Sequence, residues 1–198
     1  MDKPTLPPRP TYYKGVLMRS RLEATVAEWL DARMVKWEYE PARHSGPGGT
    51  YLPDFRLPHV HIDGKPQVLH LEVKPLRLDR QAPGEWVGPL LKSMEWVWLR
   101  EPDARLAVTS PHDDTYWRVP ITWQTPGGWK LIDGLWVRCE RCQWTGIENY
   151  RAWEGAFYLG VEEPWCCPDC GRTGFEPTTP WASVQYNRYL GRTDGGDG

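Results

Sequence analysis

Two acidic motifs lie close together in the first half of the chain. Asp54 stands in a Pro-Asp-Phe triplet, and the triplet Glu72-Val73-Lys74 begins 18 residues after it. Two carboxylates a few ångströms apart raise each other's pKa unless a cation lies between them. Oxygen ligands suit Mg2+ or Mn2+, which can polarise a phosphate oxygen and acidify a bound water. A neighbouring lysine can offset developing negative charge, so the two motifs together could hydrolyse a phosphodiester.

The second motif ends a predicted strand. Residues 68–74 are rich in aliphatic residues, with a Gly-Lys-Pro turn before them and a proline after them. Side chains alternate between faces in a strand, so Glu72 and Lys74 share a face with His70, which is a candidate to support them. By itself an acid two residues before a lysine is common. Its ordinary interpretation is a surface ion pair, which stabilises by at most about 1 kcal/mol.

The register of a hairpin decides whether the two motifs meet. Residues 50–57 predict the preceding strand, and Asp63-Gly64 is a strong turn signal. A hairpin centred on residue 63 places Asp54 opposite Glu72, whereas a two-residue loop at 63–64 shifts the register by one and separates the faces. Because Pro53 interrupts its strand, a β-bulge could settle the register either way.

A third acid, Glu23, lies in the first turn of a predicted helix. Ser20 and Glu23 have the spacing of a capping box, in which Glu23 reaches back to the Ser20 amide. Such a cap stabilises by about 0.5–2 kcal/mol and requires no chemistry. Glu23 also lies beside the apolar stripe of the helix, which comprises Leu22, Val26, Trp29, Leu30 and Met34. A helix face that borders the core can place an acidic side chain next to the sheet. The spacing therefore allows Glu23 either to cap the helix or to contribute to the site.

These motifs carry a family resemblance. Tyr-Leu-Pro-Asp54-Phe and Leu-Glu72-Val-Lys74 resemble the PD-(D/E)xK nuclease superfamily, and residues 18–30 look like its first helix, which often supplies another acid. Tyr39-Glu-Pro41 is similar to the TnsA-like and phage-type branch of the group. The resemblance covers roughly residues 12–110. It implies an α/β fold, namely a restriction-endonuclease-like mixed sheet flanked by helices, with divalent-metal catalysis and a DNA substrate.

The resemblance also implies a role for each acidic residue. Asp54 and Glu72 would bind Mg2+ or Mn2+ together with the backbone carbonyl of Val73. Lys74 would position the attacking water, and Glu23 would bind a second ion or orient water. The expected activity is that of a divalent-metal-dependent DNA endonuclease.

Four cysteines form a second pattern late in the chain. The pairs Cys139-x-x-Cys142 and Cys167-x-x-Cys170 are separated by 24 residues, and Cys166 is the odd thiol. Four thiolates complete a tetrahedral Zn2+ site with no open position for water, which predicts a structural zinc ribbon. Disulfides are the alternative, but an intracellular context disfavours them.

Composition limits the partners. The formal net charge of -2 gives no global attraction for nucleic acid. The first 22 residues nevertheless hold five basic residues, of which Arg19 and Arg21 adjoin the proposed site and are the best candidates for DNA contacts. No apolar run approaches the roughly 20 residues of a membrane span and no signal peptide is recognisable, so we expect a cytoplasmic protein with no membrane partner.

The predicted organisation has four parts. They are a basic Pro-rich arm (1–14), a nuclease-like domain (15–135), a zinc ribbon (136–178), and a C-terminal helix with a disordered tail (179–198). Within the second part we expect a helix over 85–100, a strand over 104–109, and turns and short strands over 110–134. We expect DNA as the partner, with either a homodimer or a recombination or phage-processing protein. The alternative function is a non-catalytic DNA-binding or assembly protein that keeps the fold and uses the ribbon for contact.

Overall fold

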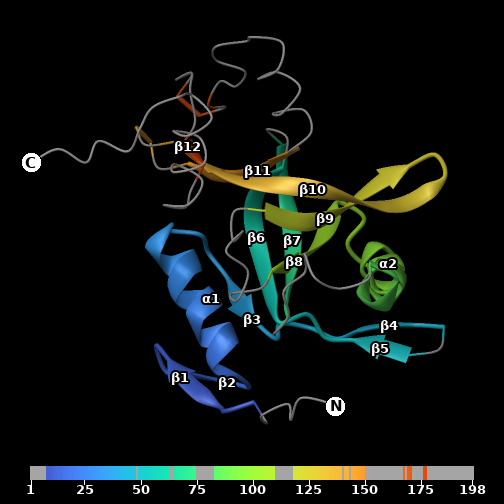
Figure 1. The fold of residues 1–198 in the computed structure, drawn as a ribbon, viewed down its shortest axis with the longest axis horizontal. Coiled ribbons are helices and arrows are strands. Elements are labelled where there is room, and N and C mark those ends of the chain that lie inside the picture. Colours follow the sequence, from blue (N-terminus) through green and yellow to red (C-terminus); the bar gives the residue numbers. More distant parts are fainter. Residues whose placement is uncertain are drawn as a thin grey trace, which may run out of the picture.

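The chain forms a curled mixed sheet with two helices, an α/β arrangement (Figure 1). The computed structural model describes residues 8–47, 49–62, 65–74, 83–109, 118–139, 141–142, 144–149, 167, 169–170 and 176–177. The predicted mixed sheet flanked by helices is confirmed at this level. Residues 1–7, half of the predicted N-terminal arm, and all of the predicted C-terminal helix and tail lie outside the described residues. The described half of the arm contains a short strand, Thr11–Tyr13. Within the described part, neither helix is long and apolar enough to cross a membrane.

The elements follow one another along the chain with these bounds. The strands are β1 (Thr11–Tyr13), β2 (Val16–Met18), β3 (Glu38–Tyr39), β4 (His44–Gly46), β5 (Gly49–Tyr51), β6 (Phe55–Ile62), β7 (Lys65–Val73), β8 (Ala104–Thr109), β9 (Arg118–Thr125), β10 (Gly128–Arg138), β11 (Thr145–Asn149) and β12 (Glu176–Pro177). The helices are α1 (Arg21–Ala32) and α2 (Pro83–Trp98). We predicted turns and short strands over residues 110–134. The described part of this stretch, 118–134, forms β9, a turn and the first part of the long strand β10.

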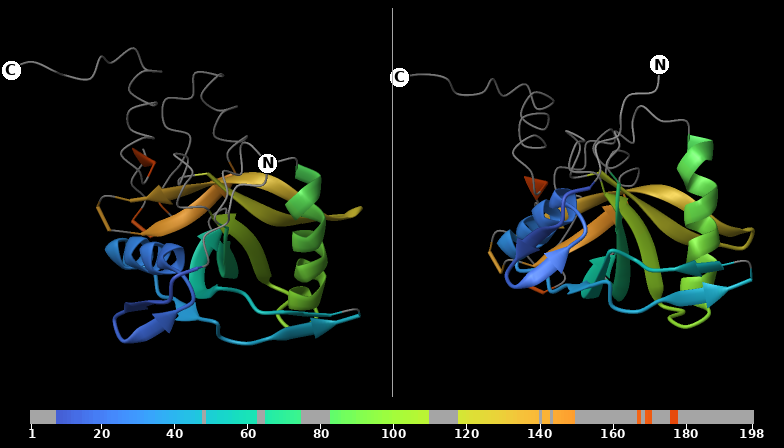
Figure 2. Two further views of the ribbon diagram at one scale, coloured as in Figure 1. Left: turned by 60° about the horizontal axis from the view of Figure 1, so that its bottom comes forward. Right: turned by 90° about the horizontal axis from the view of Figure 1, so that it is seen from below.

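The main sheet closes on itself. Its strands follow the order β3-β6-β7-β8-β9-β10-β11, and β11 also pairs with β6. The β7–β8 and β6–β11 pairs are parallel, and the other pairs in this order are antiparallel. Helices α1 and α2 lie on opposite sides of this curled sheet (Figure 2). The strand that follows the first cysteine pair, β11, is therefore part of the same sheet as the strands that carry the acidic motifs.

The β6–β7 hairpin contains both of the registers considered above. Next to the turn, Ile62 pairs with Lys65, as a two-residue loop requires. An irregularity just before Val60 then shifts the register by one residue, so that Phe55 pairs with Leu71. Such a shift is the signature of a β-bulge, which adds one unpaired residue to one strand.

The register shift determines the faces of β6 and the position of Asp54. The buried side chains of β6 are odd-numbered before the irregularity and even-numbered after it, yet all of them pack in one core. They are Phe55, Leu57, Val60 and Ile62. Continued by one residue beyond the Phe55–Leu71 pair, this register would place Asp54 opposite Glu72. The predicted single strand over 50–57 is wrong in detail, because β5 ends at Tyr51 and β6 begins at Phe55. The irregularity also lies inside β6 rather than at Pro53.

Two hydrophobic clusters cover the two faces of the sheet. The first joins α1 to the sheet and includes Met18, Ala27, Leu30, Phe55, Leu71 and Trp136. The second joins α2 to the other face and includes Leu90, Met94, Val97, Ala104, Leu106 and Val108. Burial of this apolar surface is the main favourable contribution to folding. It fixes β7, which carries Glu72, from both sides.

Helix α1 begins and ends with recognisable caps. Ser20 is the N-cap, and its side chain accepts a hydrogen bond from the amide of Glu23. At the other end, Val35 N–H donates to Leu30 O (3.0 Å) and Met34 N–H donates to Asp31 O (2.9 Å), the pattern of a Schellman motif. Met34 therefore has a positive φ of 57° and is exposed, so its predicted place on the buried stripe is wrong.

Candidate functional site

Asp54 lies buried between β5 and β6, with only 4% of its surface exposed. Its Oδ2 accepts a hydrogen bond from the backbone N–H of Val73 (2.7 Å), which ties it to the end of β7. Its Oδ1 accepts from the guanidinium of Arg19. Its carbonyl accepts from the N–H of Glu40 (3.0 Å), just after β3. Three segments of the chain therefore converge on Asp54, two of them on its carboxyl group.

Glu72 and Lys74 form a short ion pair at the end of β7. Lys74 Nζ lies 2.6 Å from Glu72 Oε1, and both side chains are partly exposed. Glu72 Oε2 accepts a hydrogen bond of 2.9 Å from the hydroxyl of Tyr51 in β5. The backbone N–H of Lys74 donates to Thr109 O in β8 (2.9 Å), which holds the chain in place just beyond the strand. The predicted pairing of acid and lysine on one face is confirmed.

Glu23 approaches the same region from α1. It is 7% exposed, and its Oε2 accepts hydrogen bonds from the hydroxyl of Tyr39 (2.5 Å) and from the backbone N–H of Arg19 (3.0 Å). The reciprocal capping bond that we predicted to the Ser20 amide goes instead to the neighbouring Arg19 amide. Glu23 is therefore buried, held by the hydroxyl of Tyr39, and hydrogen-bonded to the backbone just before α1.

Arg19 links the acidic groups of the site. Its guanidinium contacts Asp54 and lies 2.7 Å from Glu40 through Nε, while its backbone N–H also donates to Tyr39 Oη (2.9 Å). Burial opposes its charge, but the contacts with Tyr39, Asp54, Glu40 and Glu23 outweigh burial and raise its pKa further. Arg19 therefore remains a cation at every accessible pH.

The site contains more carboxylates than cations. Its linked acidic residues are Glu23, Glu40, Asp54 and Glu72, and its linked basic residues are Arg19 and Lys74. With all four acids ionised, these groups carry a net charge of -2. Burial and the neighbouring Glu72 raise the pKa of Asp54 to about 7, against the opposing effects of the Val73 N–H and Arg19. A further cation at Asp54 would relieve this excess of negative charge.

The two tyrosines remain hydrogen-bond donors in this acidic environment. Burial and the nearby Glu72 raise the pKa of Tyr51 well above its ordinary value. Burial and Glu23 raise the pKa of Tyr39 to about 12. Each phenol therefore stays protonated at neutral pH and orients one carboxylate. Neither was singled out in the sequence, although both belong to segments that carried the family resemblance, and Glu40 was missed in the same way.

Asp54 and Glu72 supply oxygen donors of the kind that a hard divalent cation takes, since Mg2+ is usually bound through one or two carboxylates with water completing its shell. In this structure their oxygens accept hydrogen bonds from Arg19, Val73, Tyr51 and Lys74. Val73 contacts Asp54 through its N–H, and its carbonyl remains a proposed ligand. Within the described residues, only the four cysteines bring three or more His, Cys, Asp or Glu ligand atoms within 4.8 Å of one another. Glu23 is thus not part of a closed three-carboxylate cage in this structure.

Other predicted candidates lie outside this cluster. Arg21 is exposed at the first position of α1. His70 is buried and contacts Glu101 (2.8 Å) rather than Glu72. Burial lowers the pKa of His70 despite the opposing effect of Glu101, so it is mainly neutral at pH 7.

The four cysteines converge as the spacing predicted. Cys139 Sγ lies 3.6 Å from Cys170 Sγ, and Cys142 Sγ lies 3.5 Å from Cys167 Sγ. Tetrahedral Zn2+ with Zn–S bonds of about 2.3 Å would separate its sulfurs by about 3.8 Å. All four sulfurs lie within 4.8 Å of one another, so the group could bind zinc. None of the four forms a disulfide.

The loop of the first cysteine pair directs backbone hydrogen bonds to Cys139. The amide of Cys139 donates to Trp144 O (2.7 Å), which closes the loop that carries Cys142. Burial raises the pKa of Cys139, but hydrogen bonds from the backbone N–H groups of Cys142 and Arg141 outweigh it and lower the pKa to about 7. Backbone donors of this kind favour the thiolate form that binds metal.

We predict that Asp54→Asn removes a pH dependence of stability. The folded protein holds the Asp54 proton more tightly than the unfolded chain, because the pKa rises from 3.8 to about 7 on folding. This contribution to stability is complete below the unfolded pKa and is lost as the pH rises toward 7. We expect urea unfolding without divalent metal to show this difference. Between pH 4 and pH 8, the free energy of unfolding of the variant should rise relative to that of the wild type by on the order of 1–4 kcal/mol. Parallel stability profiles for the two proteins would contradict this prediction.

We predict one zinc ion per chain, bound through Cys142 and its three partners. Cys142 is exposed, so Cys142→Ser removes a ligand with little effect on packing. Metal analysis of the purified variant should show a loss of most of the zinc. Cys166→Ser, which lies outside both Cys-x-x-Cys pairs, should retain it. Zinc-free wild-type protein, or full zinc in Cys142→Ser, would rule out the site.

Comparisons with known proteins add no name to this geometry. No protein-family model matches the chain, and no curated protein and no solved structure matches it. The chemistry of the described side chains is therefore the basis on which a function can be proposed.

Proposed function

We propose that the protein is a divalent-metal-dependent endonuclease that hydrolyses phosphodiester bonds in DNA. The observation that carries this proposal is the buried Asp54 carboxyl group opposite Glu72, with Lys74 bonded to that glutamate. The resemblance of the two motifs to the PD-(D/E)xK superfamily supports the same assignment. The substrate class, DNA, rests on that resemblance and on the basic residues that border the site.

Asp54 and Glu72 are the residues that would hold Mg2+ or Mn2+, with the Val73 carbonyl as a third ligand. When bound, the ion would polarise a phosphate oxygen and acidify a water molecule. Asp54 gives up its proton near neutral pH, so it becomes available as an anionic ligand in the range where such enzymes work. Tyr51 holds one oxygen of Glu72, which limits the rotation of that side chain.

Lys74 supplies positive charge beside the reacting groups. Its ammonium group bonds to Glu72 Oε1 at 2.6 Å and is partly exposed, so it can also donate to a water or a phosphate oxygen. The hydrogen bond between its backbone and Thr109 fixes the base of the side chain. We assign Lys74 the role of orienting the attacking water and offsetting the charge that develops on the phosphate.

In this proposal the guanidinium of Arg19 has two alternative partners, the Asp54 carboxylate and a DNA phosphate. In this structure the guanidinium of Arg19 pairs with Asp54, although the Arg19 side chain is 55% exposed. A metal ion at Asp54 would displace it by charge repulsion. The released guanidinium would then be free to contact a DNA phosphate next to the site, since arginine binds phosphate oxygens in a bidentate manner.

The alternative function is a non-catalytic DNA-binding or assembly protein. A protein without catalysis has no need for a buried carboxyl group beside a second acid, because such a pair destabilises the fold at neutral pH. The presence of Asp54, Glu72 and Lys74 together therefore favours the enzyme.

The test is a cleavage assay on supercoiled, linear and branched DNA with Mg2+ or Mn2+. We expect Asp54→Asn, Glu72→Gln and Lys74→Met each to reduce the rate by about 100-fold or more. Because Asp54→Asn should be at least as stable as the wild type at neutral pH, its loss of activity could not be attributed to unfolding.

Two exposed residues provide matched controls for charge. Glu28→Gln and Lys36→Ala remove one negative and one positive charge outside the site and should leave the rate unchanged. Cleavage by the wild type that persists in all three site variants would refute the mechanism. Absence of cleavage on every substrate, with DNA binding retained, would favour the non-catalytic alternative.

A further inference from the structure

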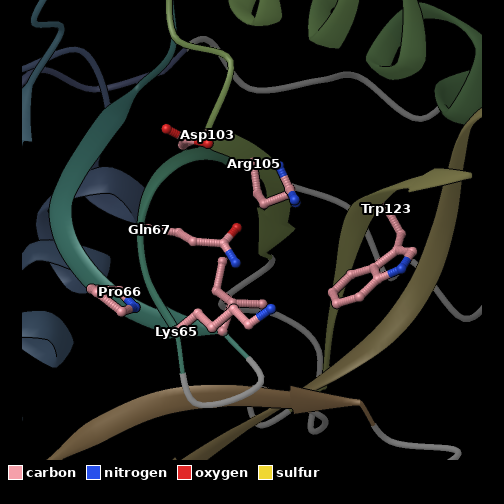
Figure 3. Close-up of a pocket in the computed structure, with 7 residues that line it drawn as sticks. Lys65, Pro66, Gln67, Asp103, Arg105 and Trp123 are labelled. Atoms are coloured by element: carbon pink, nitrogen blue, oxygen red, sulfur yellow. The ribbon is translucent and has the colours of Figure 1, made fainter.

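A pocket lies at the opposite end of β7 from the acidic site. It has a volume of about 470 Å3, within the range of about 300–1,000 Å3 that is usual for small-molecule sites. Its described lining comes from the β6–β7 hairpin, the start of β8 and the strand β9 (Figure 3). Gln67 in this lining is five residues before Glu72, which corresponds to roughly 17 Å along the strand. The pocket is therefore separate from the proposed catalytic centre.

Arg105 is the most unusual residue of this pocket. Its Nε is buried and has no hydrogen-bond partner within the described residues. Two indole rings hold the guanidinium instead of a carboxylate: its centre lies 5.9 Å from the ring of Trp123 and 5.5 Å from that of Trp129. These cation–π contacts leave Nε without a partner, while Nη1 donates a hydrogen bond to the backbone carbonyl of Ala104 (2.9 Å). A buried donor without a partner costs free energy, which a ligand could recover.

Three further groups surround Arg105 in the pocket. Lys65 is exposed at the start of β7 and has no ion pair among the described residues. The Oε1 of Gln67 is buried and lacks a hydrogen-bond partner within the same part of the chain. The side chains of Gln67, Lys65 and Trp123 extend toward one hollow in Figure 3. Asp103 is exposed at the edge, so these charged groups carry a net charge of +1.

We propose that this pocket binds a nucleotide. Arg105 and Lys65 would contact the phosphate, and the Trp123 ring would contact the face of the base. Gln67 offers an unpaired acceptor, which suits a base with an exocyclic amine such as adenine or cytosine. Stacking on an aromatic ring contributes to the binding of any base, and two cations beside it select a phosphorylated ligand.

This site does not depend on the proposed hydrolysis. A free mononucleotide and the terminal nucleotide of a single strand carry the same chemistry, and binding measurements can distinguish them. Titration calorimetry without added divalent metal keeps the acidic site out of the experiment. The probes are AMP, adenosine, inorganic phosphate and a short single-stranded oligonucleotide with a 5′-phosphate.

We expect AMP to bind more tightly than either adenosine or phosphate alone. Lys65→Ala should weaken AMP binding by about tenfold or more, because a charge-assisted hydrogen bond is lost. Arg105→Gln should weaken AMP binding at least as much. If Arg105→Gln misfolds, Lys65→Ala still tests the proposal, because Lys65 is exposed. Lys36→Ala removes an exposed lysine elsewhere and should bind AMP like the wild type.

The outcomes separate the possibilities clearly. Tighter binding of the oligonucleotide than of AMP would identify a strand end as the natural ligand, and the reverse would identify a free nucleotide. Equal binding of phosphate and AMP would overturn the nucleotide assignment. Undiminished AMP binding by both pocket variants, or no AMP binding by the wild type at millimolar concentration, would overturn it as well.

Discussion

Burial of the Asp54 carboxyl group opposite Glu72 is the constraint on which the rest of the site depends. The β6–β7 register brings the two acids together, and the Val73 N–H holds Asp54 at the strand end. A buried carboxylate beside a second one is unfavourable without a compensating cation, and Arg19 supplies one through its ion pair with Asp54. The surrounding hydrogen bonds from Tyr39 and Tyr51 orient acids that would otherwise repel each other and separate.

The fold provides this arrangement through its two hydrophobic clusters. Strand β7 lies between the cluster under α1 and the cluster under α2, so its end is fixed on both faces. The parallel pairing of β7 with β8 continues to the last residue of the strand, where Thr109 lies beside Val73. The opposite end of the same strand borders the pocket around Arg105. One rigid strand thus connects an acidic site and a basic pocket.

Local rules were sufficient for part of this structure. Alternation, capping chemistry and ligand spacing were enough to predict a strand over residues 68–74, the helix capped by Ser20 and the convergence of four cysteines. The observed strand β7 spans Lys65–Val73. The hairpin register could not be decided, because a two-residue turn and a later bulge act in opposite directions and only packing places the bulge. The sequence also could not predict the pairing of β11 with β6 or the partners of Arg19. These contacts join residues far apart in the chain and depend on tertiary packing.

The central claim is that Asp54 and Glu72 bind a divalent cation. Titration of the zinc-loaded protein with Mn2+, followed by electron paramagnetic resonance, measures this directly. We expect the wild type to bind Mn2+ at pH 8 and to lose affinity as the pH falls below about 7, where Asp54 takes up its proton. Asp54→Asn and Glu72→Gln should bind at least about tenfold more weakly, because each loses a charged ligand. Equal Mn2+ affinity in the wild type and both variants would contradict the account.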